Sequence, residues 1–189
     1  IIAGKIPPRI PSIYPLTPPE PSCVLYLDFQ DTGKLIDHSG YGNHGVVSTS
    51  GCTVVPTSYG IARDFDGATG LVSCSAGVKT SIFTQGAMTW EAIVRIHSTG
   101  EGNAGRLCQR GTLATQGYVI YFPPEDANYV RITATIEHVT TDANSNSLSG
   151  AGGRIPRNVW VNLMIVYNPV DKKIRFYSDR IDALYYPNG

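Results

Sequence analysis

The sequence predicts an all-β protein, an antiparallel sandwich or barrel, from three observations. Short apolar segments alternate with a period of two, as in residues 89–97, where Trp90, Ala92 and Val94 share one side. Clusters of Gly, Pro and Asn separate these segments. No segment of about ten residues or more keeps a helical period.

Taken in order, the expected strands share this alternation and end at turn formers. They cover residues 23–29, 45–48, 60–66, 70–74, 89–97, 117–122, 129–137, 160–168 and 172–179. Asn168-Pro169-Val170-Asp171 has the composition of a hairpin turn between the last two strands. Residues 140–153 are small and polar, which predicts an exposed loop.

Residues 1–22 are predicted to form an extended arm. They contain seven prolines and no apolar periodicity, so they can form neither a helix nor a central strand. Such an arm becomes ordered by lying on a surface, either of its own domain or of a neighbouring subunit. We expect residues 23–189 to form the single folded domain.

Composition excludes two classes of partner. The formal net charge is zero and no run of basic residues occurs, so a nucleic acid is not an expected partner. No stretch approaches the roughly 18 to 20 apolar residues of a membrane span, so none is expected.

Six segments in sequence order resemble the laminin G-like or concanavalin A-like lectin and glucanase superfamily, which includes the pentraxins. They are LYLDF, LIDHSGYGNHG, ARDFDGATGLVSC, MTWEAIVRI, RLCQRG and VWVNLMIVYNPVDKKIRFYSD, across residues 25–179. In the family, the second corresponds to an Asp-x-Ser-Gly-x-Gly-Asn-x-Gly loop and the third to a Phe-Asp-Gly hairpin.

The resemblance implies that residues 23–189 form a two-sheet antiparallel jelly roll in an extracellular, cell-surface or virion protein. Members of the family continue past the last hairpin into strands that close the sheet, whereas this sequence ends at Gly189. We therefore expect an open edge, to be filled by residues 1–22 or by another chain.

The loop at residues 35–45 has two readings. Asp37 and Ser39 can each accept a hydrogen bond from the amide two residues on, and Gly40, Gly42 and Gly45 allow positive φ in a tight turn. Alternatively, the resemblance implies Ca²⁺ as a cofactor, with Asp37 and Asn43 supplying part of its oxygen shell. We expect the loop histidines, His38 and His44, to be exposed rather than metal-bound.

The sequence does not predict an enzyme. Glucanases of the resembled family carry Glu-x-Asp-x-Glu on one strand, but the five glutamates here are dispersed. Adjacent Glu125 and Asp126 are expected to cap the turn at Pro123-Pro124. No Gly-x-Ser-x-Gly elbow is present.

Tyrosines are the candidate ligand-binding residues, because sugar rings stack on aromatic faces. Tyr118, Tyr121 and Tyr129 lie on predicted strands, where each can instead be a core or edge side chain. Among the four cysteines, Cys52 and Cys74 flank neighbouring strands and are the first candidates for a disulfide, with buried free thiols as the alternative.

Three functions fit these observations. The resemblance favours a non-catalytic, lectin-like recognition or adhesion module that binds glycan or protein. The Pro-rich arm and the expected open edge favour a structural subunit of a virion, filament or surface layer, linked to its neighbours by residues 1–22. An accessory domain of a carbohydrate-active enzyme is a third reading.

Overall fold

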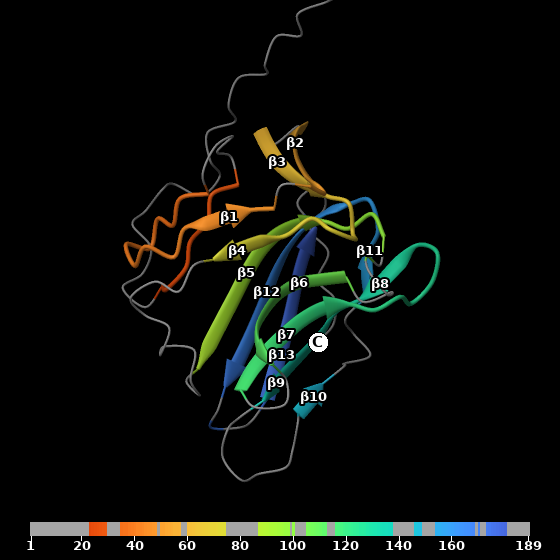
Figure 1. Cartoon of the computed structure of the whole chain (residues 1–189). Coiled ribbons are helices and arrows are strands. Elements are labelled where there is room, and N and C mark those ends of the chain that lie inside the picture. The colour runs from red at the N-terminus through yellow and green to blue at the C-terminus, as the bar shows by residue number, and fades with distance from the viewer. Residues whose placement is uncertain are drawn as a thin grey trace, which may run out of the picture. The chain divides into compact units, whose positions relative to one another are not determined.

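The computed structural model describes thirteen strands and no helix among the residues that it places (Figure 1). The described residues are 23–29, 35–48, 50–57, 60–74, 87–98, 100, 105–112, 116–137, 146–148, 154–168, 170 and 173–180. The strands are β1 (Gly45–Val47), β2 (Cys52–Thr57), β3 (Gly60–Phe65), β4 (Val72–Cys74), β5 (Met88–Arg95), β6 (Gly105–Thr112), β7 (Gln116–Phe122), β8 (Tyr129–Arg131), β9 (Thr133–Glu137), β10 (Asn146–Leu148), β11 (Arg154–Pro156), β12 (Trp160–Asn168) and β13 (Lys173–Arg180). The predicted all-β class is confirmed.

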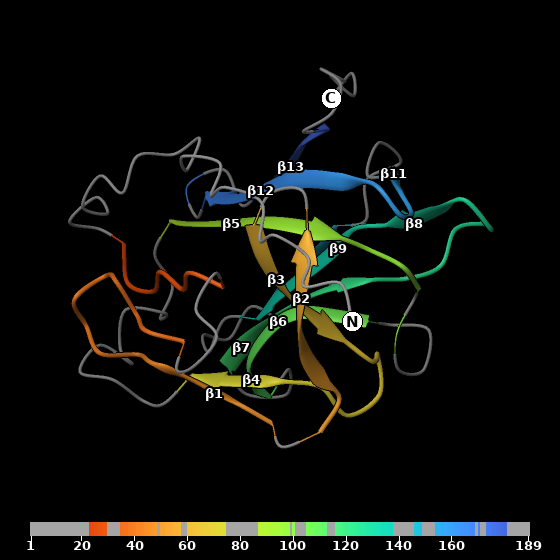
Figure 2. The same cartoon turned by 90° about the horizontal axis from the view of Figure 1, so that it is seen from above.

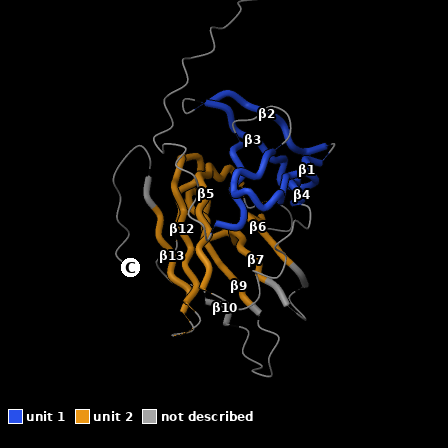
Figure 3. The backbone as a smooth tube through the Cα atoms, turned by 90° about the vertical axis from the view of Figure 1, so that its left-hand side faces the viewer, with its two compact units in different colours: residues 1–82 blue, residues 83–189 orange. Residues whose placement is uncertain are grey.

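The chain divides into two compact units, residues 1–82 and 83–189 (Figure 3). In the first unit, β1 pairs with β4 and β2 pairs with β3, both antiparallel.

The segment that resembles a Phe-Asp-Gly hairpin therefore joins strands of two different sheets. Its turn is held by Asp66, whose Oδ1 accepts the amides of Ala68, Thr69 and Gly70, and these bonds hold the pKa of Asp66 well below its usual range.

The second unit contains a three-stranded sheet in the order β13-β12-β5 and a four-stranded sheet in the order β10-β9-β7-β6. Strands β8 and β11 form a further two-stranded ladder. Figure 2 shows β5, β12 and β13 as one layer and β6, β7 and β9 as another. Side chains from both sheets meet in one hydrophobic core.

Period-two alternation explains how the three-stranded sheet contributes to that core. Along β12, the side chains of Val161, Leu163 and Ile165 are each 1% exposed, while Met164 between them is exposed. Strand β5 alternates in the same way, and Trp90, on its inner side, packs edge-on against Tyr118 with ring centroids 5.0 Å apart. The alternation predicted for the strands at residues 89–97 and 160–168 is confirmed.

The core of the second unit consists of aliphatic and aromatic side chains. Its buried members are Ile96, Tyr118, Ile120, Phe122, Val130, Ile132, Ala134, Ile136, Ile155, Val161, Leu163, Ile165, Tyr167 and Ile174. The ladder between β6 and β7 shifts register between Arg106 and Cys108, which is a bulge at Leu107. Both Leu107 and Cys108 pack against the core as a result.

The prediction of a strand over residues 23–29 is wrong. Among the described residues, that segment makes a single bridge, Leu27 to Asp37, and Leu25 is 37% exposed. Hydrogen bonds to side chains, in place of a β-ladder, satisfy backbone groups of this segment. Asp37 accepts the amide of Tyr26, and Asn43 donates to the carbonyl of Val24.

Several predictions about loops and termini fall on residues outside the described ranges. Residues 1–22, expected as an arm, lie there, as does most of 140–153, where the described residues 146–148 form β10 instead of loop. The hairpin expected at residues 168–171 is supported by the antiparallel register, in which Asn168 faces Lys173. Within the described residues the structure has no helix able to cross a membrane.

Candidate ligand-binding site

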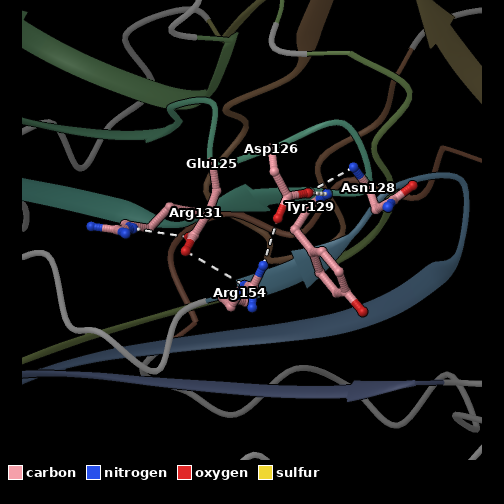
Figure 4. A network of polar contacts seen from close by, with 6 residues as sticks. All are labelled: Glu125, Asp126, Asn128, Tyr129, Arg131 and Arg154. Atoms are coloured by element: carbon pink, nitrogen blue, oxygen red, sulfur yellow. Dashed lines mark hydrogen bonds and ion pairs between the residues drawn. The ribbon is translucent and has the colours of Figure 1, made fainter.

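A turn that leads into β8 carries a group of polar and aromatic side chains (Figure 4). Oδ1 of Asp126 accepts the amide of Asn128 at 2.7 Å and that of Tyr129 at 2.9 Å. Asp126 also donates its own amide to the carbonyl of Tyr129 at 3.2 Å. An aspartate that bonds the backbone two and three residues on stabilises a tight turn. The turn fixes where Tyr129 enters the strand.

Two arginines reach this turn from neighbouring strands. Nε of Arg131, on β8, lies 3.1 Å from Oε2 of Glu125. Arg154, on β11, lies 3.5 Å from Oε1 of Glu125 through Nε and 2.6 Å from Oδ2 of Asp126 through Nη2. Because β11 pairs with β8 and places Arg154 opposite Arg131, the two guanidinium groups share the same pair of carboxylates.

The ring of Tyr129 completes the group. The guanidinium carbon of Arg154 lies 4.4 Å from the ring centroid, a cation–π contact. Tyr129 remains 36% exposed. We call Glu125, Asp126, Asn128, Tyr129, Arg131 and Arg154 the Tyr129 site. It offers an aromatic ring, carboxylates, an amide and guanidinium groups at one place on the surface.

Both carboxylates of the Tyr129 site are ionised at neutral pH. The hydrogen bond from Arg131 lowers the pKa of Glu125, and the amide of Asn128 lowers that of Asp126. A general acid in glycoside hydrolysis needs a raised pKa so that it holds a proton near neutral pH. The electrostatics of this pair therefore favour binding over proton transfer.

The three candidate tyrosines do not form one surface. Tyr118 is 8% exposed and belongs to the core, so its ring does not face a ligand. Tyr121 lies three residues further along β7, hence on the opposite side of that strand, and is half-buried. Tyr129 is the exposed one of the three. Arg154, which contacts its ring, was not among the residues predicted from the sequence.

The loop at residues 35–45 is built around Asp37, which is 5% exposed. Its Oδ1 accepts the amides of Tyr26 and Ser39, each at 2.9 Å, and its Oδ2 accepts that of Asn43 at 2.8 Å. Burial alone would raise the pKa of Asp37, but these hydrogen bonds outweigh it and hold the pKa below 3.8. The predicted Asp37 to Ser39 bond is confirmed.

Two glycines of this loop behave as predicted. Gly40 and Gly42 have φ of 88° and 73°. Gly45 does not adopt positive φ; it is required for close packing, because an added Cβ would lie 2.8 Å from Cγ1 of Val72 and 2.9 Å from Cβ of Leu35.

The two readings of the loop give its side chains different partners, which are backbone amides in a tight turn or Ca²⁺ in a metal site. Nδ1 of His44 accepts the amide of Asp37 at 3.1 Å, and the His38 ring lies against that of Tyr26. The described residues contain no group of three His, Cys, Asp or Glu side chains placed to hold a metal ion. Binding of Ca²⁺ by Asp37 and Asn43 stays a prediction, whereas the hydrogen bonds of the turn are present.

The four cysteines are free thiols in the structure. Cys52 starts β2 and Cys74 ends β4, on different sheets of the first unit, and a bridge between them stays a prediction. Burial raises the pKa of all four thiols, and that of Cys108 to about 12.

Comparison of the chain with models of known protein families, with curated proteins and with solved structures found no match. The resemblance to laminin G-like and concanavalin A-like proteins therefore rests on the sequence motifs, and function has to be argued from the Tyr129 site.

Proposed function

We propose that the chain is a non-catalytic, lectin-like recognition module of a surface-exposed protein, with a jelly-roll sandwich as its scaffold, and that it binds glycan at the Tyr129 site. The observation that carries the proposal is the exposed Tyr129 ring, held in place by Arg154 and surrounded by ionised carboxylates. Sugars bind through ring stacking together with hydrogen bonds to carboxylate and amide groups. The antiparallel all-β architecture supports the scaffold.

A glycan array probed with the full chain tests the proposal. We expect a defined set of glycans to bind, and Tyr129→Ala to weaken binding by about twofold to tenfold, since losing an aromatic contact costs about 0.5–1.5 kcal/mol. Tyr129→Phe keeps the ring and should retain most of the affinity.

Phe65→Ala is the matched control, because Phe65 is an exposed aromatic residue on β3, at 42% exposure, outside the Tyr129 site. It should bind as the unaltered chain does. A chain that binds no glycan, or whose affinity Tyr129→Ala leaves unchanged, would rule out this site as the glycan-binding surface.

A further inference from the structure

The outward face of the β8–β11 ladder brings an aromatic ring and two guanidinium groups to one side. Tyr129 and Arg131 are two residues apart on β8, and Arg154 is opposite Arg131 on β11. Val130 and Ile155, which follow Tyr129 and Arg154 along the two strands, are 0% and 1% exposed. The ring and the guanidinium groups therefore lie on the side of the ladder away from the core.

The carboxylates of the Tyr129 site are already paired within the chain. Oε1 of Glu125 lies against Nε of Arg154, and Oε2 of Glu125 accepts a hydrogen bond from Arg131. Oδ1 of Asp126 accepts two backbone amides, and its Oδ2 accepts a hydrogen bond from Arg154 at 2.6 Å. Every carboxylate oxygen of the site therefore has a donor of the chain beside it.

The donors of Arg131 are only partly used. Its Nε lies 3.1 Å from Oε2 of Glu125, whereas Nη1 and Nη2 contact no acceptor among the residues that the structure describes. Figure 4 shows this end of the side chain directed away from Glu125 and from Arg154. The side chain is 39% exposed. Its outer edge therefore offers two parallel N–H groups, which match the two oxygens of a carboxylate.

We propose that the glycan bound at the Tyr129 site is acidic, with a sugar ring on Tyr129 and a sugar carboxylate on Nη1 and Nη2 of Arg131. This inference rests on the proposed function, because it names the class of glycan that the same site takes. Tyr129 and Arg131 stand at opposite ends of the group in Figure 4, with Arg154 between them. The ligand is therefore an oligosaccharide rather than a single sugar.

Charge and geometry together favour an acidic sugar over a neutral one at this position. A hydroxyl group can accept one hydrogen bond from Arg131, whereas a carboxylate can accept two parallel bonds and also attracts the cation. Glu125 lies on the Nε side of Arg131, so a carboxylate of the ligand approaches the guanidinium group from the other side. The acidic ligand gains an attraction that its neutral counterpart lacks.

Matched pairs of glycans on an array probed with the full chain test the proposal. The pairs are sialylated N-acetyllactosamine with its desialylated form, and a hyaluronan hexasaccharide with its carboxyl-reduced form. We expect the acidic member of at least one pair to bind about fivefold to tenfold more tightly, because the additional bond and the charge attraction act at a partly exposed position. Sulfated N-acetyllactosamine distinguishes a sulfate from a carboxylate.

Arg131→Gln should abolish the preference, so that both members of a pair bind equally. Arg131→Lys keeps the charge without the planar edge and should keep only part of the preference. Arg106→Gln is the matched control, because it removes the same charge from an exposed position of β6 outside the Tyr129 site, and it should keep the full preference.

The outcomes separate this inference from the proposed function. Equal binding of acidic and neutral members, or a preference that Arg131→Gln leaves intact, overturns the acidic ligand while glycan binding stands. A preference confined to the sulfated glycan overturns the assignment to a carboxylate. A chain that binds no glycan on the array overturns both proposals together.

Discussion

Asp37 shows how one buried carboxylate organises a segment that has little other structure. Its two oxygens bind backbone amides from residues 26, 39 and 43. These hydrogen bonds tie the segment 23–29 to the loop, where the structure describes a single β-bridge between them. A charge can be buried at this position because each oxygen has donors aimed at it.

We predict that Asp37→Asn destabilises the fold by about 1–3 kcal/mol, because an amide nitrogen replaces one oxygen and leaves a buried backbone donor without an acceptor. Chemical denaturation followed by circular dichroism measures the change. Asp64→Asn, at an exposed position of β3, should unfold at the same denaturant concentration as the unaltered chain. Equal midpoints for all three proteins would contradict the role given to Asp37.

The same carboxylate predicts a direction for the pH dependence of stability. The folded-state pKa of Asp37 lies below its ordinary value of 3.8, so its contribution is complete above that pH and is lost as the pH falls further. The unaltered chain should therefore lose more stability than Asp37→Asn on acidification below about pH 4.

At the level of elements, alternation predicted the long strands β5, β12 and β13, missed the equally long β6, and failed for the segment 23–29. Strands β5 and β12 run side by side over eight residue pairs, so their pattern reflects a sheet with one buried face. Residues 23–29 show the same pattern, yet their backbone groups bond to side chains of the loop. Periodicity detects an amphipathic segment, and it does not reveal whether a partner strand exists.

Only part of the Tyr129 site could be predicted, because the sequence pattern does not show which strands pair. Glu125 and Asp126 were expected to cap a turn at Pro123-Pro124, but Pro124 forms a β-bridge with Val130, and Asp126 holds the turn that follows. Arg154 is 28 residues away from Asp126, and it arrives through a ladder of three residue pairs between β8 and β11. Strands this short have too little pattern to be paired from sequence.

We predict that Ile165→Ala, in the centre of β12, destabilises the second unit by about 2–5 kcal/mol, because it removes a buried side chain and leaves a cavity. Thermal and denaturant unfolding would show this loss. Val170→Ala is the control, since Val170 is 90% exposed and should change stability by no more than about 0.5 kcal/mol. Equal effects of the two substitutions would contradict the inward orientation of Ile165.

In the molecule as a whole, hydrophobic burial is distributed unevenly between the two units. Leu35 is the single buried hydrophobic side chain among the described residues of the first unit, whereas the second unit contains the entire core cluster. The first unit relies on turns held by Asp37 and Asp66 and on close packing at glycines.

We predict that a fragment of residues 83–189 folds without residues 1–82, because every buried member of the core cluster lies within it. Dispersed amide signals in an NMR spectrum and a cooperative thermal transition would show this. The complementary fragment, residues 1–82, serves as the comparison and should remain unfolded. An unfolded 83–189 fragment would mean that the chain is one folding unit, as the sequence suggested.

The bulge at Leu107 has a consequence for how sequences of this kind can vary. One extra residue in β6 lets both Leu107 and Cys108 pack against the core, so the inward and outward positions of the strand exchange at that point. Deleting Leu107 would leave Gly105 opposite Phe122 and Arg106 opposite Tyr121, so both would keep their sides of the sheet and the bulge would disappear. A homologue that is one residue shorter in β6 should therefore alternate between inward and outward residues without interruption across this point.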